Sequence, residues 1–522
     1  MNCIDKDTIR WWTVIVIGFI VVLLSESINF HYIQKRTEPW FSYATDSNYD
    51  GVDSNEGQLI ENKFDKVYDT LYRQANPVVS PSMTDKRQKF VLETWIRRSS
   101  SINDEDRLLL ADTFLKSSSV IEFGSGETTH IASITGVPRY VCIDVDAENI
   151  SNMREIVDNE SFRFFLSDIG KVDEYGYPYE DMLPKVPYDY QVVPLILEKD
   201  AFDFYLVHGI TFKGSCIIIA FLHAIKCGAD LSNVVVGVIE RNHHPLQSII
   251  SEVADLLSQS DNVSLYKLKS SMTEHDLFYT WLALEKNALL ISQPLPNGVS
   301  AFQFIADHLF AKAMEPPPIE KRYFYLSDTE ERDSTSLEDS DRQLIGDLYY
   351  NASSVFEFGL GESSAIASWV GVPRFAGVDT DDLKLSYLQT KIQANHFRLY
   401  LGDVGNVMEC GEPADIQLTK NHFDYQIAPL VAESFAFDLY YIDGPWRQAC
   451  VAISFLHAIK HKGDLSSIKV ILHDSLRSEY DVIEQKIADL ITRTDHMWVF
   501  QLKNGVTEDT IWKYWSEVSH IM

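Results

Sequence analysis

The residues best suited to chemistry lie in two short stretches near the C-terminus. Tyr441-Ile-Asp-Gly-Pro-Trp-Arg447 carries an acid and an arginine, and Ile471-Leu-His-Asp-Ser-Leu-Arg477 carries a histidine and a second acid. Each stretch begins in an apolar run that predicts a buried strand, and neighbouring parallel strands end at the same edge of a sheet. We therefore expect Asp443 and Asp474 to lie close together.

Two carboxylates beside an imidazole suit a hard divalent cation of the Mg or Mn type, so Asp443 and Asp474 are predicted metal ligands. A bound divalent ion lowers the pKa of a hydroxyl and orients its oxygen. His473 is then a candidate base, and Arg447 a candidate clamp for a substrate carboxylate. The alternative is that Asp443 only caps a helix or forms the turn before Gly-Pro.

Upstream lies a glycine-containing motif that occurs twice. The stretch from Val120 to Ser133 in the first copy returns from Val355 to Ser368, with an offset of 235 residues (357 − 122). Glycine lets the backbone turn tightly and approach a ligand closely, although glycines at strand ends are also common for steric reasons alone. The candidate cofactor-binding residues of the two loops are Glu122, Gly124, Gly126, Glu357, Gly359 and Gly361.

An acid follows each glycine loop by about 20 residues, at the end of the next predicted strand. It is Asp144 in the first copy and Asp379, or Asp381, in the second. In nucleotide-binding sheets a carboxylate at this place binds ribose hydroxyls. The loops lack the third glycine of the dinucleotide fingerprint, which disfavours a nicotinamide cofactor.

The repeat covers most of the chain and indicates a duplicated domain, because solenoid repeats have periods of about 20–50 residues. We expect one domain over residues 61–291 and another over residues 298–522, each long enough to bury its own core. Both alternate short apolar strands with helical stretches, which predicts parallel βαβ units in a doubly wound α/β sheet. The strands expected in the second copy are 354–358, 374–378, 397–401, 437–442 and 468–472.

These motifs resemble class I S-adenosylmethionine-dependent methyltransferases over both copies. The shared features are Glu-Phe-Gly-x-Gly-Glu-[Ser/Thr]-[Ser/Thr], an acid ending the second strand and an Asp-Gly ending the fourth. The resemblance implies two tandem Rossmann-like domains with S-adenosylmethionine as cofactor. It implies that the glycine loop holds the methionine part, that Asp144 and Asp379 hold the ribose, and that Asp168 and Asp403 lie beside the adenine.

The second copy further resembles metal-dependent O-methyltransferases, which carry metal-binding acids at the ends of strands four and five. Asp-Gly-x-x-Arg-x-x-Cys followed by His-Asp-x-x-Arg is also similar to the plant polysaccharide O-methyltransferase group of glucuronoxylan type. The resemblance implies methyl transfer to a hydroxyl of a glycan or a small molecule. Two alternatives stay open: a non-catalytic pseudo-methyltransferase that binds or scaffolds, and another nucleotide-linked transferase.

The first copy departs from the second at the chemical residues. His208 replaces Asp443, and Ile239-Glu240 replaces His473-Asp474. His208 and Glu240 are still ligand-type side chains, so a metal site in this copy stays open. We expect the first copy to be degenerate or regulatory and the second to be catalytic.

A polar trio outside these motifs is present in both copies. Asp189-Tyr190-Gln191 and Asp424-Tyr425-Gln426 each lie in an insertion before the fourth strand. Polar residues in loops often carry function. A substrate lid and a structural cap are equally good explanations.

The composition and the N-terminus bear on partners and location. A net charge of −31 argues against a nucleic-acid partner, because phosphates require a basic surface. An apolar stretch without a small-x-small cleavage site favours a membrane signal anchor over a signal peptide or a soluble helix. We expect a type II membrane protein of the ER or Golgi with a lumenal body. Its segments would be a tail (1–10), an anchor (11–30) and a stalk (31–60).

Overall fold

The computed structural model describes most of the chain after residue 61. The described residues are 62–77, 87–92, 102–157, 161–170, 178, 185–208, 212–240, 244–285, 293–315, 322–325, 337–392, 394, 396–408, 412–414, 419–461, 463–474 and 478–521. The predicted tail, anchor and stalk (residues 1–60) lie outside this set. Among the described helices, none is both long and apolar enough to cross a bilayer.

The first copy forms a seven-stranded sheet with the order β3-β2-β1-β4-β5-β7-β6. Strands β1 to β5 pair in parallel, whereas β7 runs antiparallel to both β5 and β6. The strands are β1 (Ser119–Phe123), β2 (Arg139–Asp144), β3 (Phe162–Leu166), β4 (Phe204–Val207), β5 (Val235–Ile239), β6 (Ala254–Gln259) and β7 (Val263–Leu268).

The second copy repeats this sheet with the order β10-β9-β8-β11-β12-β14-β13. Its five parallel strands lie where the sequence predicts them, and the antiparallel β13–β14 hairpin was not predicted. The strands are β8 (Ser354–Phe358), β9 (Arg374–Asp379), β10 (Arg398–Leu401), β11 (Leu439–Ile442), β12 (Lys469–His473), β13 (Ala488–Arg493) and β14 (Met497–Leu502). The prediction of two tandem doubly wound α/β sheets is confirmed.

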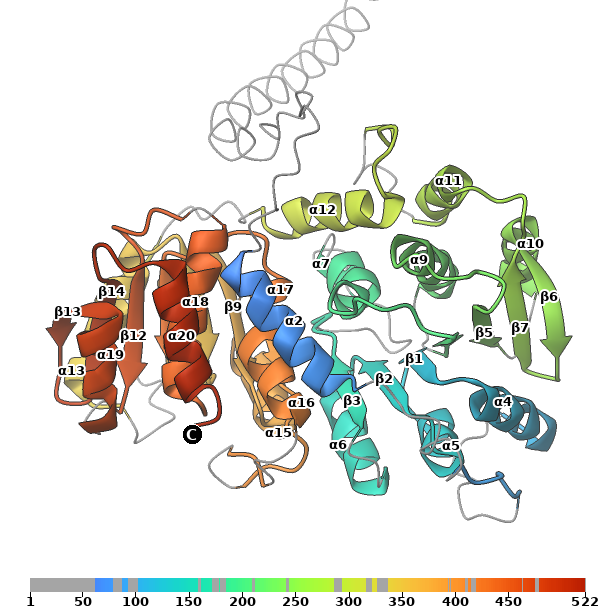
Figure 1. The fold of residues 1–522 in the computed structure, drawn as a ribbon, viewed down its shortest axis with the longest axis horizontal. Helices are drawn as coiled ribbons and strands as arrows, with labels where there is room; N and C mark the ends of the chain where they lie inside the picture. The colour runs from blue at the N-terminus through green and yellow to red at the C-terminus, as the bar shows by residue number, and fades with distance from the viewer. Residues whose placement is uncertain are drawn as a thin grey trace, which may run out of the picture. The chain divides into compact units, whose positions relative to one another are not determined.

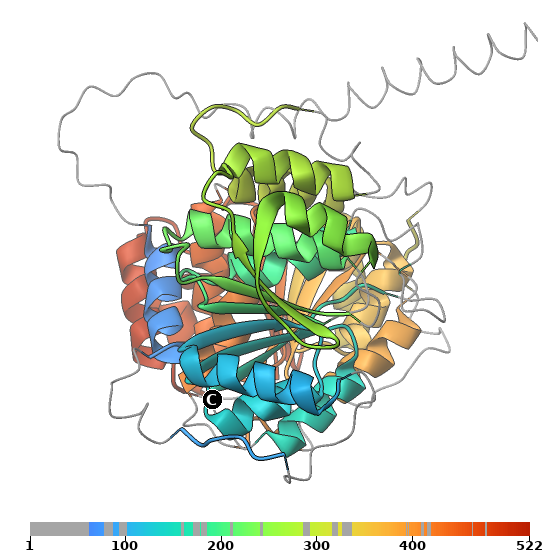
Figure 2. The ribbon, with the colours of Figure 1, turned by 90° about the vertical axis from the view of Figure 1, so that its right-hand side faces the viewer.

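Helices cover both faces of each sheet (Figures 1 and 2). Those of the first copy are α4 (Asp104–Lys116), α5 (Glu127–Thr135), α6 (Ala147–Ile156), α7 (Lys185–Pro187), η2 (Tyr188–Val192), α8 (Val193–Ile196), α9 (Lys213–Lys226), α10 (His244–Val253) and α11 (Glu274–Leu284). Those of the second are α13 (Asp339–Asn351), α14 (Glu362–Val370), α15 (Asp382–Lys391), α16 (Thr419–His422), η4 (Phe423–Ile427), α17 (Ala428–Val431), α18 (Arg447–Lys460), η5 (Ser478–Tyr480), α19 (Asp481–Lys486) and α20 (Glu508–Val518).

The two sheets meet at their edge strands, β3 and β10, which we call the inter-copy interface together with α6 and α15. The backbone N–H of Phe164 donates to Asp403 at 2.9 Å, and Lys420 donates to the carbonyl of Phe162 at 2.7 Å. Polar side chains of the second copy thus satisfy backbone groups of an edge strand that would otherwise be unpaired.

The same contacts recur in the opposite direction. The N–H of Leu399 on β10 donates to Asp168 at 3.3 Å, and Lys185 donates to the carbonyl of Phe397 at 2.5 Å. Each of these residues is the counterpart, 235 positions away, of one that makes the contact in the other direction (403 − 168 and 420 − 185). The interface is therefore two-fold in character, as in a symmetric homodimer.

A lead-in helix precedes each copy, and each packs on the other copy. Helix α2 (Lys63–Ala75), coloured blue in Figure 1, lies against α16, η4, α18 and α20. Helix α12 (Ala301–Ala313) lies against α7, η2, α9 and α11. Residues 61–522 consequently form one compact unit, and the cores of the two copies are continuous.

Candidate functional site

The glycine loop of the second copy is held between β8 and β11. Gly359 has a φ of 86°, in the left-handed region that favours glycine. A Cβ at this position would lie 2.6 Å from the backbone carbonyl of Asp443. The N–H of Asp443 donates to the carbonyl of Phe358 at 2.7 Å, so the end of β11 and the loop form one rigid edge.

The structure brings together the four residues predicted at the ends of strands four and five. Nδ1 of His473 lies 2.9 Å from Oδ1 of Asp443. The guanidinium of Arg447, at the start of α18, reaches Asp443 at 3.2 Å and Asp474 at 3.4 Å. It also donates to the backbone carbonyl of His473 at 2.6 Å, which ties α18 to β12.

His473 has the bonding pattern of an oriented base. Burial opposes its charged form, but the hydrogen bond and the negative charge of Asp443 outweigh this effect and raise the pKa of His473. Its Nε2 atom is buried and has no hydrogen-bond partner within the described part of the chain. Because Nδ1 is engaged by the carboxylate, Nε2 is the nitrogen that is left for a further hydrogen bond.

The predicted metal ligands face a cation that belongs to the chain itself. Arg447 lies between Asp443 and Asp474, where a shared divalent ion would have to bind. The described residues contain no group of three or more His, Cys, Asp and Glu side chains that could hold a metal. As arranged, the two carboxylates do not fit a shared metal, since one guanidinium already lies between them and contacts both.

The other side of the loop carries the acid that ends β9. Oδ2 of Asp379 accepts from the N–H of Leu360 at 2.8 Å and from Lys384 at 3.0 Å. Asp381, the alternative acid, caps α15 by accepting from the N–H of Lys384 at 3.0 Å. A Cβ at Gly361 would meet no atom of the described residues within 4 Å, so space is open over the start of α14.

The glutamates of the two glycine motifs do not reach this space. Glu357 is fully buried and accepts from Ser364 at 2.5 Å and Tyr349 at 2.5 Å. Glu122 is equally buried and is bonded by Thr128, Thr129 and Tyr140. Burial raises the pKa of each carboxyl to about 7. The cofactor-binding role predicted for these two residues is therefore corrected to a structural one, joining the first strand to the following helix.

Asp168 and Asp403 are also placed differently from the prediction. Asp403 is fully buried and is bonded by Lys420 at 3.0 Å, Arg154 at 2.9 Å and the N–H of Phe164. These cations hold the pKa of Asp403 well below its ordinary value, against the effect of burial. Both acids bridge the inter-copy interface, so their oxygens are engaged there rather than beside an adenine.

The first copy keeps the frame of the site, with an imidazole beside its glycine loop. Asp144 accepts from the N–H of Ser125 at 2.8 Å, as Asp379 does from that of Leu360 in the second copy. A Cβ at Gly126 would lie 3.9 Å from Cε1 of His208, so this imidazole lies against the loop. Burial and the charge of Lys213 lower the pKa of His208 to about 4, which leaves the ring neutral.

Lys213 is the counterpart of Arg447 in the first copy. The sequence analysis did not identify this correspondence. The two positions align with an offset of 234 (447 − 213), one less than the offset of the glycine motifs, and the same offset relates His223 to His457 (457 − 223). Both follow a left-handed aromatic residue, Phe212 with a φ of 56° and Trp446 with a φ of 53°. Lys213 donates to the carbonyl of Ile239 at 2.7 Å, as Arg447 does to that of His473.

The polar trio of the second copy is a structural cap that also brings one group to the site. Asp424 pairs with Arg163, and Gln426 donates to the carbonyl of Ser519. Tyr425 packs its ring against Phe358 and Trp446. Its hydroxyl touches Gly444, is fully buried and has no hydrogen-bond partner among the described residues.

Comparisons with known proteins give similarity of fold only. No protein-family profile and no curated protein matches the sequence. A methyltransferase-like protein from Silicibacter pomeroyi aligns over 36% of this chain and 97% of its own, with 15% identity and a TM-score of 0.30.

Two further structures align over longer stretches of the chain. One is a 16S rRNA methyltransferase of T. thermophilus in complex with AdoMet and guanosine (76% of this chain, 92% of its own, 8% identity, TM-score 0.23). The other is a phosphoethanolamine N-methyltransferase of Haemonchus contortus in complex with phosphoethanolamine and S-adenosylhomocysteine (81% and 87%, 10% identity, TM-score 0.21). At this level of likeness, the functional argument rests on the residues of the site.

Proposed function

We propose that this protein is an S-adenosylmethionine-dependent O-methyltransferase whose chemistry lies in the second copy. The observation that carries the proposal is the cluster of Asp443, His473 and Arg447 at the sheet edge, directly beside a glycine loop with open space over Gly361. The acceptor we propose is a hydroxyl of a glycan or a small molecule. The apolar N-terminal stretch supports a membrane-anchored enzyme in the secretory pathway.

The proposed cofactor supplies a methyl group on a positively charged sulfur, which an oxygen nucleophile attacks. Gly361 and the start of α14 would hold its amino-acid part, and Asp379 would contact the ribose. Asp403 has no part in this binding, because its oxygens are engaged at the inter-copy interface.

His473 is positioned to take the proton of the acceptor hydroxyl. Nε2 would accept this proton and so make the acceptor oxygen a better nucleophile. Asp443 holds the ring through Nδ1, fixes the tautomer and stabilises the imidazolium that results. Arg447 fixes the positions of both carboxylates and of the His473 backbone, so the base is held rigidly before the substrate binds.

Calorimetry of the full chain with S-adenosylmethionine tests the assignment. We expect one site per chain, because His208 lies against the glycine loop of the first copy. Gly361→Val should abolish binding by filling the open space, at an extended backbone position that valine tolerates. Asp144→Asn, which alters the acid of the first copy that corresponds to Asp379, should leave binding unchanged. If the unaltered chain does not bind S-adenosylmethionine, the methyltransferase assignment is wrong. If it binds at two sites, the expectation that only the second copy binds the cofactor is wrong.

Turnover separates the enzyme from a binding or scaffold protein. We expect methyl transfer to persist in a chelator, because Arg447 occupies the place between the two carboxylates. Loss of turnover in the chelator, with recovery on adding Mg²⁺ or Mn²⁺, would restore the metal-dependent mechanism. Cofactor binding without turnover on any hydroxyl acceptor would favour the pseudo-methyltransferase alternative.

A further inference from the structure

The lead-in helix of the first copy packs closely on the second copy. The ring of Phe64 lies 5.3 Å from that of His457, and Asp65 pairs with Lys460 at 2.6 Å. One turn further along α2, Tyr68 stacks on Phe423 at 5.9 Å, with the ring planes 23° apart. Phe423 is the first residue of η4, so α2 supports the helix that carries Tyr425.

Helix α12 makes the equivalent contacts on the first copy. The ring of Phe302 lies 5.5 Å from His223, the counterpart of His457. Lys226 lies 4.9 Å from the ring of Phe302, and Lys460 lies 4.9 Å from the ring of Phe64. The two helices are thus exchanged between the copies, as the N-terminal arms of a domain-swapped dimer are.

An arginine on each edge strand completes the exchange, with unequal geometry. Arg163 on β3 binds both carboxylate oxygens of Asp424, with distances of 2.8 to 3.1 Å, and lies 4.6 Å from the ring of Phe423. Its counterpart Arg398 approaches Asp189 only to 3.5 Å. The arginine contact of the first copy with η4 is therefore closer than the arginine contact of the second copy with η2.

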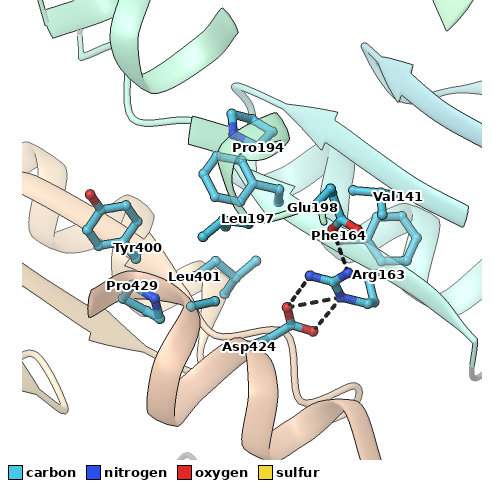
Figure 3. A pocket seen from close by; sticks show the side chains of 12 residues that line it. Val141, Arg163, Phe164, Pro194, Leu197, Glu198, Tyr400, Leu401, Asp424 and Pro429 are labelled. Carbon is cyan, nitrogen blue, oxygen red and sulfur yellow. Dashed lines mark hydrogen bonds and ion pairs between the residues drawn. The ribbon is translucent and has the colours of Figure 1, made fainter. Parts of the chain in front are cut away.

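The contact between Arg163 and Asp424 lies in the interior of the protein. Arg163, Glu198 and Asp424 line a small cavity between the copies, and Figure 3 shows the guanidinium pointing across it at both acids. Arg163 is 5% exposed and Asp424 9% exposed, so removing Arg163 would leave the buried carboxylate of Asp424 without its partner. The position of η4 is consequently fixed by the first copy as well as by its own.

We propose that the first copy acts as a built-in partner that positions the site of the second copy. Through α2 and Arg163 it holds η4, and thereby the buried hydroxyl of Tyr425, against Gly444 and the glycine loop. The surface it uses is the inter-copy interface, and the partner this surface fits is a homologous domain of the same fold. The effect on turnover rests on the proposed function, whereas the physical coupling does not.

Hydrogen exchange in the full chain tests the coupling. Phe64→Ala removes the contact of α2 with His457 on α18 and so loosens the helix whose Tyr68 supports η4. It should increase amide exchange across residues 419–431, while residues 185–196 keep their protection. Phe302→Ala is the matched control and should do the reverse, because α12 packs on η2. If the two variants loosen both segments equally, or loosen neither, the proposal is overturned. Should either alanine variant fail to fold, Phe64→Leu and Phe302→Leu make the same comparison.

Turnover then tests the positioning role. We expect Phe64→Ala to lower kcat by about tenfold with little change in KM, since a misplaced group slows the step without weakening binding. Phe302→Ala should leave kcat within about twofold, given the expected independence of the two segments. If Phe64→Ala and Phe302→Ala have equal kcat values but increase amide exchange in different segments, the positioning role is overturned. The methyltransferase assignment would then stay intact. If the unaltered chain shows no turnover, the methyltransferase assignment is wrong. The hydrogen-exchange result would still decide whether the first copy is coupled to η4.

Discussion

His473 illustrates how one side chain acquires a role from its two nitrogens. Nδ1 faces Asp443 at 2.9 Å, and Nε2 is buried without a partner in the described residues. A histidine that only packs in a core normally satisfies both atoms, as His457 does by bonding Tyr440 and the carbonyl of Glu433. The unsatisfied atom therefore supports the proposed role of His473 as the base.

Replacing His473 should remove chemistry and keep cofactor binding. His473→Gln leaves the glycine loop and Asp379 untouched, so the Kd for S-adenosylmethionine should stay within about twofold, while kcat falls by about 10²–10⁴. Calorimetry and a methyl-transfer assay measure the two quantities separately. The control is Glu240→Gln, at the equivalent of Asp474 in the first copy, which should leave kcat unchanged. Unaltered kcat in His473→Gln would rule out this residue as the base.

The buried carboxyl of Glu357 should make stability depend on pH. Burial raises its pKa from the ordinary 4.5 to about 7, so the folded protein keeps a proton that the unfolded chain loses. The contribution is fully present below about pH 4.5 and is lost as pH rises through about 7. Glu357→Gln has no such proton to lose. The unfolding free energy of the variant minus that of the unaltered chain should therefore rise between pH 5 and pH 8, on the order of 1–3 kcal/mol.

Urea unfolding of both chains across this pH range measures the effect. Glu122→Gln should behave in the same way, because burial raises the pKa of Glu122 to about 7 as well. A difference between variant and unaltered chain that stays constant with pH would contradict the assignment of a protonated, structural carboxyl.

Single residues of the site were predictable where one sheet positions them. Asp443 and His473 end adjacent strands, and the pattern of strands alone places them together. Asp168 and Asp403 were assigned to an adenine because nothing in a sequence shows which edges of two sheets meet. The contact of Arg447 with both carboxylates was likewise hidden, since it depends on the left-handed turn at Trp446.

At the scale of elements, η4 is the piece that links the interface to the site. It packs under α2 on one side and brings Tyr425 to the end of β11 on the other. The strands could be predicted from their apolar runs, but the exchange of α2 and α12 could not. Both lead-in helices are amphipathic, and a hydrophobic face does not specify which copy covers it.

The contact between η4 and β11 should be sensitive to one methyl group. A Cβ at Gly444 would overlap the hydroxyl of Tyr425, so Gly444→Ala should destabilise the fold by about 1–3 kcal/mol. Tyr425→Phe removes the nearest atom and should recover part of this loss in the double variant. Urea unfolding gives the comparison, with Gly361→Ala as the control because space is open there. Equal stability of the two glycine variants would contradict the described packing.

At the scale of the molecule, the chain behaves as a dimer whose subunits are covalently joined. The connection around residues 293–300 is largely exposed, whereas the contacts between the copies are buried. The duplication predicted two sheets correctly. It did not predict one continuous core, because a linear repeat carries no information on how its units associate.

Cutting the connection should therefore leave the protein in one piece. A protease site inserted between Gly298 and Val299 of the full chain, cleaved after folding, should give two fragments that elute together at the volume of the intact chain. The reason is that α2 and α12 each remain docked on the opposite fragment. Dissociation at micromolar concentration in native buffer would show that the connection, and not the interface, holds the copies together.

The reciprocal bonds across β3 and β10 also constrain how such a chain can evolve. His208 could replace an acid because its neighbours belong to one copy only. Arg163, by contrast, can change only together with Asp424, which lies 261 positions away. In related sequences we expect paired substitutions at these interface positions and independent drift around His208. On the proposed function, gene duplication would release the first copy from selection on a reaction while keeping it under selection as a neighbour.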